Sequence, residues 1–410
     1  MTEHGTSIVI TSRHRSAALR RCLCALHQQD HPRIELIVVA DPAACAALAL
    51  LADRVKLIPF DKPNISAARN LGLTQAAGEV VAFIDDDAVP EPSWIRRLAR
   101  PFNDHRVAAA TGFVRGRNGI SYQWKAAWID HLGEDTLLDV DATAATLHAG
   151  DARRAVKTQG TNMAFRRAPL MAAGGFDPAL HFYLDEAHVD LTLAAAGHLT
   201  AVVPEAQVHH SFAASERRRA DRAPLSLAEI GASTAVFLRR HAAQEDPAPA
   251  LARLRAAQRR RLLTMMVDGR LSPPDVKRLL ATLEAGLTEG AARPLPALGP
   301  LADDPPPFRA LPGTGPRPGV VLAGRPWSRR QLRRAALTQL EAGRIATLLC
   351  LGPNARPHRM RFDTEGYWEQ SGGLFGRSER SGPRFRFARF NDRLRREIGR
   401  IGQFRPVGTE

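Results

Sequence analysis

Short apolar runs and stretches of helical spacing alternate along the first 90 residues of the chain. Four runs of aliphatic and β-branched residues predict buried strands, at residues 7–11, 34–39, 54–59 and 80–84. Between them, apolar residues recur at helical spacing over 16–28 and 65–77. Asn64 is the predicted N-cap of the second helix, because its side-chain oxygen can accept a hydrogen bond from a free first-turn N–H. Strands that alternate with helices predict an α/β fold with a mainly parallel sheet, whose ligands bind beyond the carboxyl ends of the strands.

The pattern is less regular in the rest of the chain. Strands are predicted at 107–115 and 199–203, with two short helices between them. Residues 242–318 alternate basic amphipathic helices with Pro-rich joints, and 294–318 has the composition of a linker. Beyond it, strands are predicted at 319–322, 345–351 and 358–362, and a helix is predicted at 328–342. We therefore predict an N-terminal α/β domain, a helical and Pro-rich connection and a small basic α+β domain, over residues 1–240, 241–318 and 319–410.

Composition places the chain among globular proteins. It has 410 residues, 44% of them hydrophobic and 24% charged, which excludes a disordered or collagenous chain. Four cysteines are too few for a disulfide framework and indicate a reducing compartment. The sequence contains neither an apolar run of about 18 residues nor the pattern of a signal peptide, so we expect a cytoplasmic protein.

The net charge of +15 is concentrated late in the chain. Residues 321–410 contain 19 Arg, no Lys and 8 acidic residues, a net charge of +11. This surplus fits either a solvated surface or a basic face toward an anionic membrane, glycan or nucleic acid. Arginines alternate with Phe385, Phe387 and Phe390, which fits either a strand pair with its aromatic rings inward or an Arg–aromatic platform for a glycan or nucleic acid.

Three consecutive carboxylates, Asp85, Asp86 and Asp87, directly follow the predicted strand at 80–84. Ionised groups so close together repel one another and resist burial, so they call for a neutralising partner. A divalent cation with oxygen ligands is one solution, and Mg²⁺ commonly binds one or two carboxylates together with phosphate oxygens. The other interpretation is an acidic turn before a helix that Pro90 and Pro92 introduce.

The stretch around these carboxylates resembles family-2 glycosyltransferases of GT-A fold. It contains, in order, Ala68-Arg-Asn-Leu-Gly72 on a helix, a strand into Asp85-Asp-Asp87, then Pro90 and Trp94. The resemblance covers about residues 6–212. It implies a metal-dependent enzyme that moves a sugar from a nucleotide-diphosphate donor to an acceptor hydroxyl, with inversion of the anomeric configuration and with Mn²⁺ or Mg²⁺ as cofactor.

The resemblance also implies a role for individual residues on the donor side. The metal ligands match Asp87, Asp85 and His210, with Asp85 also facing the ribose and Asp86 assisting. Residues expected to contact the donor match Thr11, Arg15, Asp41, Asn64 and Arg69. Asp41 would contact the uracil or thymine ring. Arg69 has a second interpretation, as the ion-pair partner of the acidic loop, by which we mean Asp85–Asp87.

On the acceptor side, the resemblance implies that the segment at Gly160, Thr161 and Asn162 borders the site. It also implies a pair of acids, Asp185 and Glu186, at the start of a helix. Transfer with inversion needs a general base that takes the acceptor proton, and we assign this role to Glu186 in preference to Asp185. The alternative for Asp185 is a helix cap.

Three positions depart from the family pattern: Ala40, His188 and Thr192, with Asp190 as a displaced acid. We therefore weigh three functions. The leading one is transfer from a UDP- or dTDP-sugar to a glycan or lipid-linked acceptor in cell-surface polysaccharide synthesis, at the inner face of the membrane. The others are sugar transfer to nucleic acid or protein, and a nucleotide-sugar-binding scaffold without activity.

Overall fold

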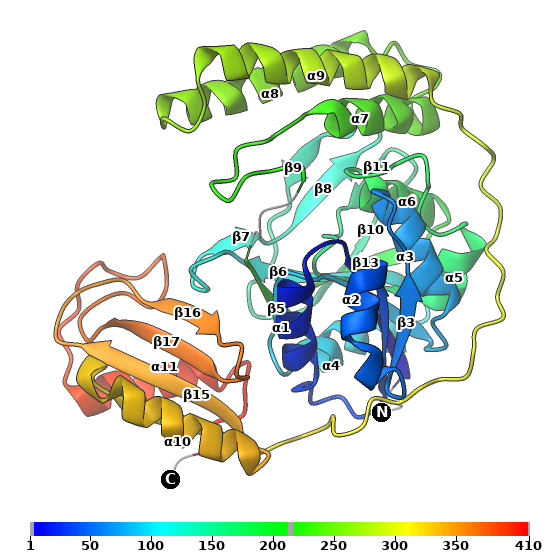
Figure 1. Ribbon diagram of the computed structural model, residues 1–410. Coiled ribbons are helices and arrows are strands. Elements are labelled where there is room, and N and C mark those ends of the chain that lie inside the picture. The colour runs from blue at the N-terminus through cyan, green and yellow to red at the C-terminus, as the bar shows by residue number, and fades with distance from the viewer. Residues whose placement is uncertain (1–3, 212–215, 409–410) are drawn as a thin grey trace.

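A computed structural model describes residues 4–211 and 216–408 of the chain. Figure 1 shows a large α/β unit, a layer of long helices on one side of it and a smaller unit of strands and helices at the other end. The strands of the central sheet are β1 (Thr6–Ser12), β2 (Ile34–Ala40), β3 (Val55–Pro59), β4 (Val80–Asp85), β5 (Ala88–Pro90), β6 (Val107–Arg115), β7 (Tyr122–Trp124), β10 (Thr146–Ala149), β12 (Met163–Arg166) and β13 (Leu199–His210). They run in the order β10-β13-β6-β12-β4-β1-β2-β3, with β5 beside β13 and β7 beside β6.

Parallel pairing dominates the half of the sheet that the sequence predicts most clearly. β1 lies between β2 and β4, β3 lies outside β2, and all these pairs are parallel. β12 enters antiparallel between β4 and β6. The expected α/β class with a mainly parallel sheet is confirmed, as are the four predicted strands. Asn64 is the N-cap of α3 (Ile65–Thr74), where its side chain accepts a hydrogen bond from the Ala67 N–H at 2.9 Å.

Helices cover both faces of the sheet. The helices of this unit are α1 (Ser16–Leu26), α2 (Pro42–Ala47), α3, α4 (Trp94–Ala99), α5 (Arg167–Ala172) and α6 (Asp185–Ala195). Side chains of α1 and α4 pack in one core with Ile8 and Ile10 of β1. Those of α3, α5 and α6 pack in a second core with Val9. Because side chains alternate across a strand, the apolar run of β1 supplies both cores, which explains why it lacks a polar face.

Three helices form a separate layer beside a small antiparallel sheet. The helices are α7 (Ala228–His241), α8 (Ala248–Val267) and α9 (Pro273–Ala292), and the sheet is formed by β8 (Ala127–Asp130), β9 (Asp135–Leu137) and β11 (Arg154–Val156). α7 packs closely along α9, where a Cβ on Gly286 would lie 1.9 Å from the Ala228 carbonyl oxygen. α8 and α9 confirm the helices predicted within residues 242–318, and the domain boundaries stay a prediction.

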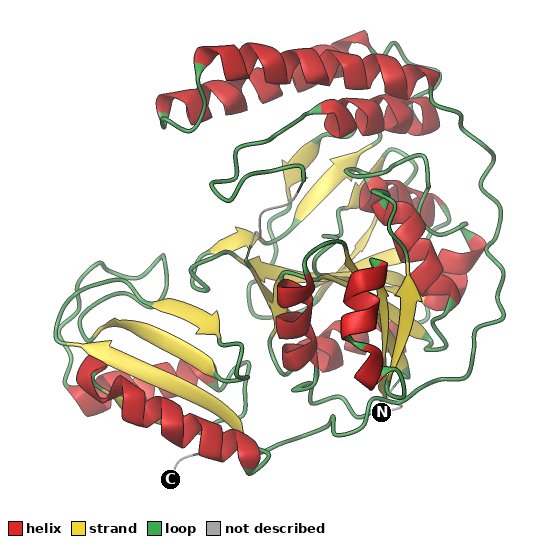
Figure 2. Ribbon diagram, viewed as in Figure 1, coloured by secondary structure: helices red, strands yellow, loops and turns green. Residues whose placement is uncertain are grey.

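The predicted linker is an extended segment bound along the N-terminal unit. Residues 293–318 contain no helix or strand and run down one side of the molecule (Figure 2). The Leu311 N–H donates to the Ile34 carbonyl at 2.8 Å, and the Lys56 ammonium donates to the Pro306 carbonyl at 3.3 Å. The Arg309 N–H donates to the carboxylate of Glu35, which is buried in β2. These contacts hold the segment to the sheet, so it does not act as a free tether.

The C-terminal unit is a four-stranded sheet with two helices. Its elements are β14 (Gly319–Gly324), α10 (Arg329–Glu341), β15 (Ile345–Gly352), β16 (Arg359–Phe362), β17 (Trp368–Gly373) and α11 (Phe390–Ile401). β14, β15 and β17 are parallel, and β16 pairs antiparallel with β17. The strand-pair interpretation of residues 384–390 is wrong. No strand forms there, because Phe385 pairs with Gly376 only in an isolated bridge, and Phe385 and Phe387 are 60% and 75% exposed.

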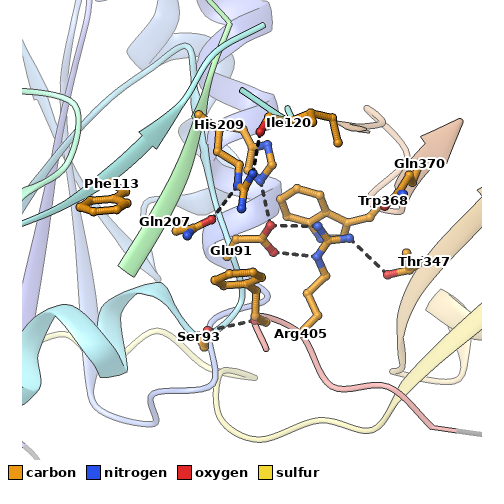
Figure 3. A network of polar contacts seen from close by, with 12 residues as sticks. Glu91, Ser93, Phe113, Ile120, Gln207, His209, Thr347, Trp368, Gln370 and Arg405 are labelled. Carbon is orange, nitrogen blue, oxygen red and sulfur yellow. Dashed lines mark hydrogen bonds and ion pairs between the residues drawn. The ribbon is translucent and has the colours of Figure 1, made fainter. Parts of the chain in front are cut away.

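A buried ion pair joins the C-terminal unit to the loop that follows β5 (Figure 3). Arg405 forms two hydrogen bonds with the Glu91 carboxylate, at 2.6 and 2.9 Å, and both side chains are 2% exposed. His209 Nε2 lies 2.8 Å from the same carboxylate, and the guanidinium lies 3.8 Å from the Trp368 ring centroid. Glu91 stands four residues after Asp87, so this pair fixes the C-terminal unit to the back of the acidic loop.

Candidate active site

A cavity of about 460 Å³ opens at the carboxyl ends of the central strands. Nine of the residues expected at the site line it: Arg15, Arg69, Asp85, Asp87, Gly160, Thr161, Asp185, Glu186 and His210. They come from β4, β13, α3, α6 and the loops after β1, β4 and before β12. The parallel register explains the convergence, because strands that share a direction end at the same edge of the sheet.

Asp85, Asp87 and His210 form a group suited to a metal ion. One ligand atom from each lies within 4.8 Å of the others, and His210 Nε2 lies 3.1 Å from Asp87 Oδ1. His210 Nδ1 lies 3.1 Å from the Gln123 amide oxygen, so this contact orients the ring with Nδ1 toward Gln123 and Nε2 toward Asp87. Two carboxylates and an oriented imidazole are ligands that Mn²⁺ or Mg²⁺ accepts, so these residues fit the expected cation.

Asp86 points away from this group, into the protein. It accepts a hydrogen bond from the Ser12 hydroxyl at 2.6 Å and pairs with Arg15 at 2.6 Å. Burial raises the pKa of Asp86 to about 7, against the opposing effects of Arg15 and Ser12. Its contacts indicate a role in holding the Arg15 loop against β4.

Guanidinium groups surround the two metal-facing carboxylates. Arg15 Nη1 lies 3.5 Å from Asp87, and Arg218 Nη2 lies 3.6 Å from the same carboxylate. Arg69 Nη2 lies 3.9 Å from Asp85 and donates to the Gly160 carbonyl at 3.3 Å. The closest partner of Arg69 is Asp185, a buried side chain on α6. Arg69 therefore links the acidic loop, the Gly160 segment and the acid pair, so its ion-pair interpretation is confirmed, and its contact with the donor stays a prediction.

The acid pair is presented by a strained turn. Tyr183 and Leu184, directly before α6, have φ angles of +84° and +63°. Two consecutive residues with side chains in this region cost free energy and persist where the surrounding structure fixes them, commonly at functional sites. The turn brings Glu186 into the cavity beside Asp185. Burial, followed by the charge of Asp185, raises the pKa of Glu186 to about 7.

Five expected donor or acceptor residues lie outside the lining. Asp41 caps α2, where it accepts from the Ala44 N–H at 3.0 Å, and Asn64 caps α3. Asn162 is fully buried, and its amide bonds Trp94 Nε1 and the Phe113 and Ala206 carbonyls. Thr11 lies next to the acidic loop, since it pairs in register with Asp85, and Asp86 belongs to the loop itself. Asp41 and Asn64 thus cap helices and Asn162 joins neighbouring segments, and the donor and acceptor roles of these residues stay predictions.

The departures from the family pattern on α6 lie on its buried side. His188 Nδ1 lies 2.9 Å from His241 Nε2 on α7, and burial lowers the pKa of His188 to about 4. The Thr192 hydroxyl donates to the His188 carbonyl within the helix. Asp190 is buried and accepts hydrogen bonds from the Thr158 N–H and hydroxyl, and burial raises its pKa. His188 and Asp190 join α6 to its neighbours, and none of the three residues lines the cavity.

The sequence did not predict several residues that line the cavity: Gln123, Tyr183, Arg217, Arg218 and Arg261. Arg217 and Arg218 stand in a run of three arginines shortly after His210, and this run was the available signal. Arg261 lies on α8 and Gln123 on β7, whose approach to the site depends on tertiary packing. Arg218 adds a third guanidinium beside Asp85 and Asp87, so the cavity combines acidic and basic groups.

Among the helices of the described residues, none is both long and apolar enough to cross a bilayer. Two curated relatives match short stretches of the chain. The succinoglycan biosynthesis protein ExoM of Rhizobium meliloti is 33% identical over 106 residues, covering 24% of this chain and 34% of its own. The glucosyl-dolichyl phosphate glucuronosyltransferase of Haloferax volcanii is 31% identical over 116 residues, covering 28% and 34%. The chain thus spans about a third of the length of these relatives.

Among solved structures, the mannosyltransferase PcManGT from Pyrobaculum calidifontis in complex with GDP-Man and Mn²⁺ aligns with 71% of this chain and 88% of its own, at 17% identity and a TM-score of 0.43. The model of the family described as glycosyltransferase like family 2 matches residues 4–223, just over half of the 410 residues. That range contains the central sheet, the acidic loop and the acid pair. The chain therefore belongs to the glycosyltransferase like family 2, as its motifs and its α/β fold predict.

Proposed function

We propose that the chain is an inverting, metal-dependent transferase that moves a sugar from a UDP- or dTDP-sugar to a hydroxyl of a glycan or lipid-linked acceptor. One observation carries this proposal: a single cavity holds a metal-type group, five arginines and an acid pair. The similarity to a succinoglycan biosynthesis protein supports a role in polysaccharide synthesis. We place the reaction in the cytoplasm, at the inner face of the membrane.

The donor side of the cavity suits a nucleoside diphosphate. Asp85, Asp87 and His210 would hold Mn²⁺ or Mg²⁺, which supplies positive charge to the leaving diphosphate. Arg15 and Arg218 already face Asp87 and are placed to contact diphosphate oxygens beside it. Both guanidiniums keep their charge throughout, so they stabilise the negative charge that develops on the leaving group.

The acid pair supplies the proton acceptor. Asp185 is engaged by Arg69, whereas the Glu186 carboxyl faces the cavity. The oxygen of the acceptor hydroxyl attacks the anomeric carbon while Glu186 takes the proton of that hydroxyl. The nucleoside diphosphate leaves from the opposite side of the anomeric carbon. This single displacement inverts the anomeric configuration. A pKa near 7 suits a base that must accept a proton in the transition state near neutral pH.

Release of nucleoside diphosphate tests the proposal as a whole. Purified protein is incubated with Mn²⁺, a panel of UDP- and dTDP-sugars and a cell extract as acceptor, and free UDP or dTDP is measured. We expect release from at least one donor, dependent on the extract. Donor binding without release from any pair would contradict the proposal and favour a binding scaffold.

Removal of the Asp87 carboxylate tests the metal group. We expect Asp87→Ala to abolish the Mn²⁺-dependent stabilisation by nucleotide sugar, which amounts to about 2.7 kcal/mol when the ligand is at 100 times its Kd. Thermal unfolding with and without EDTA measures it. Asp53→Ala removes an exposed carboxylate and should keep the full effect. A Mn²⁺-dependent shift of normal size in Asp87→Ala would exclude this group as the metal site.

The raised pKa of Glu186 predicts the pH dependence of turnover. The base acts when it is deprotonated, so kcat/KM should fall about tenfold per unit below pH 7 and level off above it. Initial rates measured from about one and a half units below to the same distance above pH 7 check this. The residual rate of Glu186→Gln should lack the inflection. A flat profile in the wild type would contradict the assignment.

A further inference from the structure

A second cavity, of about 770 Å³, lies at the end of the C-terminal sheet. Its floor is formed where β14, β15 and β17 finish, and each of these parallel strands ends in a glycine: Gly324, Gly352 and Gly373. The opposite wall is the loop between β6 and β7, at residues 118–121. The cavity therefore lies between the two units, at the carboxyl edge where open α/β sheets bind ligands.

Glycines keep this edge free of side chains. A Cβ on Gly373 would lie 2.2 Å from the Asn354 carbonyl oxygen, so the backbones of the β15 and β17 loops approach too closely for any side chain there. Gly352 and Gly372 belong to the lining itself. Helix α10 begins next to the same edge, since Pro326 and Arg329 at its start also line the cavity. Helix N-termini favour anions, because their free N–H groups carry partial positive charge.

The lining is strongly basic. It includes five arginines among sixteen residues, and no acid. Arg329 is occupied, because it donates to Glu369 at 2.6 Å. Among the described residues, no ion pair or hydrogen bond engages the guanidiniums of Arg356, Arg359 and Arg380. Three charged groups that face one cavity without counter-charges repel one another, so the cavity is suited to an anion that carries several charges.

We propose that this cavity binds a ligand that carries a diphosphate or two closely spaced phosphates. Guanidiniums match phosphate oxygens in pairs, and a diphosphate concentrates more charge than a single carboxylate. The volume lies within the range of about 300–1,000 Å³ for small-molecule sites, which favours a compact ligand over a nucleic-acid strand. Trp327, beside Pro326, is 76% exposed and offers apolar surface for the organic group attached to the phosphates.

This second site is distinct from the transferase cavity but shares a wall with it. Ser121 lines the second cavity, and Gln123, two residues later, lines the first and contacts His210. A ligand in the second cavity therefore lies against the segment that orients the metal-facing imidazole. The proposal does not depend on sugar transfer, since it concerns residues of the C-terminal unit.

The proposal is tested by titrating inorganic pyrophosphate into the full chain and measuring its affinity by calorimetry. The buffer contains EDTA, so that no divalent cation aids binding at the first cavity. We expect the wild type to bind pyrophosphate and the double variant Arg356→Ala/Arg359→Ala to bind it at least about 100-fold more weakly. Each of the two substitutions removes a charge-assisted contact. Arg330→Ala/Arg334→Ala removes the same charge from exposed α10 positions outside the cavity and should bind as the wild type does.

Two results would overturn the proposal. One is equal pyrophosphate affinity in the cavity variant and its charge-matched control. The other is loss of binding in Arg15→Ala with retention in the cavity variant, which would place the anion in the first cavity. Sedimentation with phosphatidylcholine vesicles, with and without phosphatidylinositol 4,5-bisphosphate, whose headgroup carries two adjacent phosphates, identifies the source. Loss of bisphosphate-dependent binding in the cavity variant alone assigns a lipid headgroup, and pyrophosphate binding without vesicle binding assigns a soluble ligand.

Discussion

Replacing Glu186 by glutamine is expected to lower kcat by about 10²- to 10⁴-fold and to leave donor binding unchanged. The amide has almost the same shape but cannot take a proton. Donor contacts are assigned to the other side of the cavity, to Arg15, Arg218 and the metal group, so they are retained. Turnover is measured by release of nucleoside diphosphate, and donor binding by thermal shift with Mn²⁺.

Two further variants make this result specific. Glu205→Gln changes an exposed acid on β13 away from the cavity and should keep wild-type turnover. Asp185→Asn removes the partner of Arg69, so we expect it to raise KM as well as to lower kcat, since Arg69 also approaches Asp85. Wild-type turnover in Glu186→Gln would refute the assignment of the base. Loss of turnover with unchanged KM in Asp185→Asn alone would move the role to Asp185.

Replacing Arg405 by alanine is expected to lower the free energy of unfolding by about 3–5 kcal/mol. The substitution leaves the Glu91 carboxylate buried without its two guanidinium hydrogen bonds. It also removes the cation–π contact with Trp368. Arg405 is the largest cause that lowers the pKa of Glu91, so the native state holds this group ionised. Urea denaturation followed by circular dichroism measures the loss.

A double-mutant cycle separates the pair from its surroundings. Arg395→Ala removes a 77% exposed arginine from α11 and should change stability by less than about 0.5 kcal/mol. Glu91→Gln/Arg405→Met removes both charges, and it should cost less than Glu91→Gln and Arg405→Met added together, because no charge is left unpaired. Additive single effects would show that Glu91 and Arg405 contribute separately, which would contradict the ion pair.

Much of the N-terminal unit could be predicted from local sequence. The strand at 80–84 ends in three aspartates, and a parallel sheet must place such a terminus beside other strand ends. Asn64 could be assigned as a cap because its hydrogen bond reaches only three residues along the chain. The motif around Arg69 could be placed on a helix for the same reason. These features depend on neighbours in sequence, so a single sequence contains them.

The rest depends on partners that are distant in sequence. Glu91 and Arg405 are 314 residues apart, and nothing near either one indicates the other. Arg261 reaches the cavity only because α8 lies over it with α7 and α9. Phe385 and Phe387 alternate with arginine as strand residues do, but the alternation does not say whether a partner strand exists. His188 departs from the family pattern beside the acid pair, but its ring contacts His241 of α7.

The distance along the chain between Glu91 and Arg405 also sets an order of events during synthesis. At about 5–20 residues per second, a ribosome needs about 15–60 s to make the 314 residues that separate them. The central sheet and acidic loop emerge first, and throughout this interval the carboxylate of Glu91 lacks its guanidinium. A nascent chain thus cannot complete the packing behind its metal-type group until the second unit has been translated. Completion of this packing is coupled to translation of the C-terminal unit, and a chain interrupted before Arg405 retains a Glu91 carboxylate without its guanidinium partner.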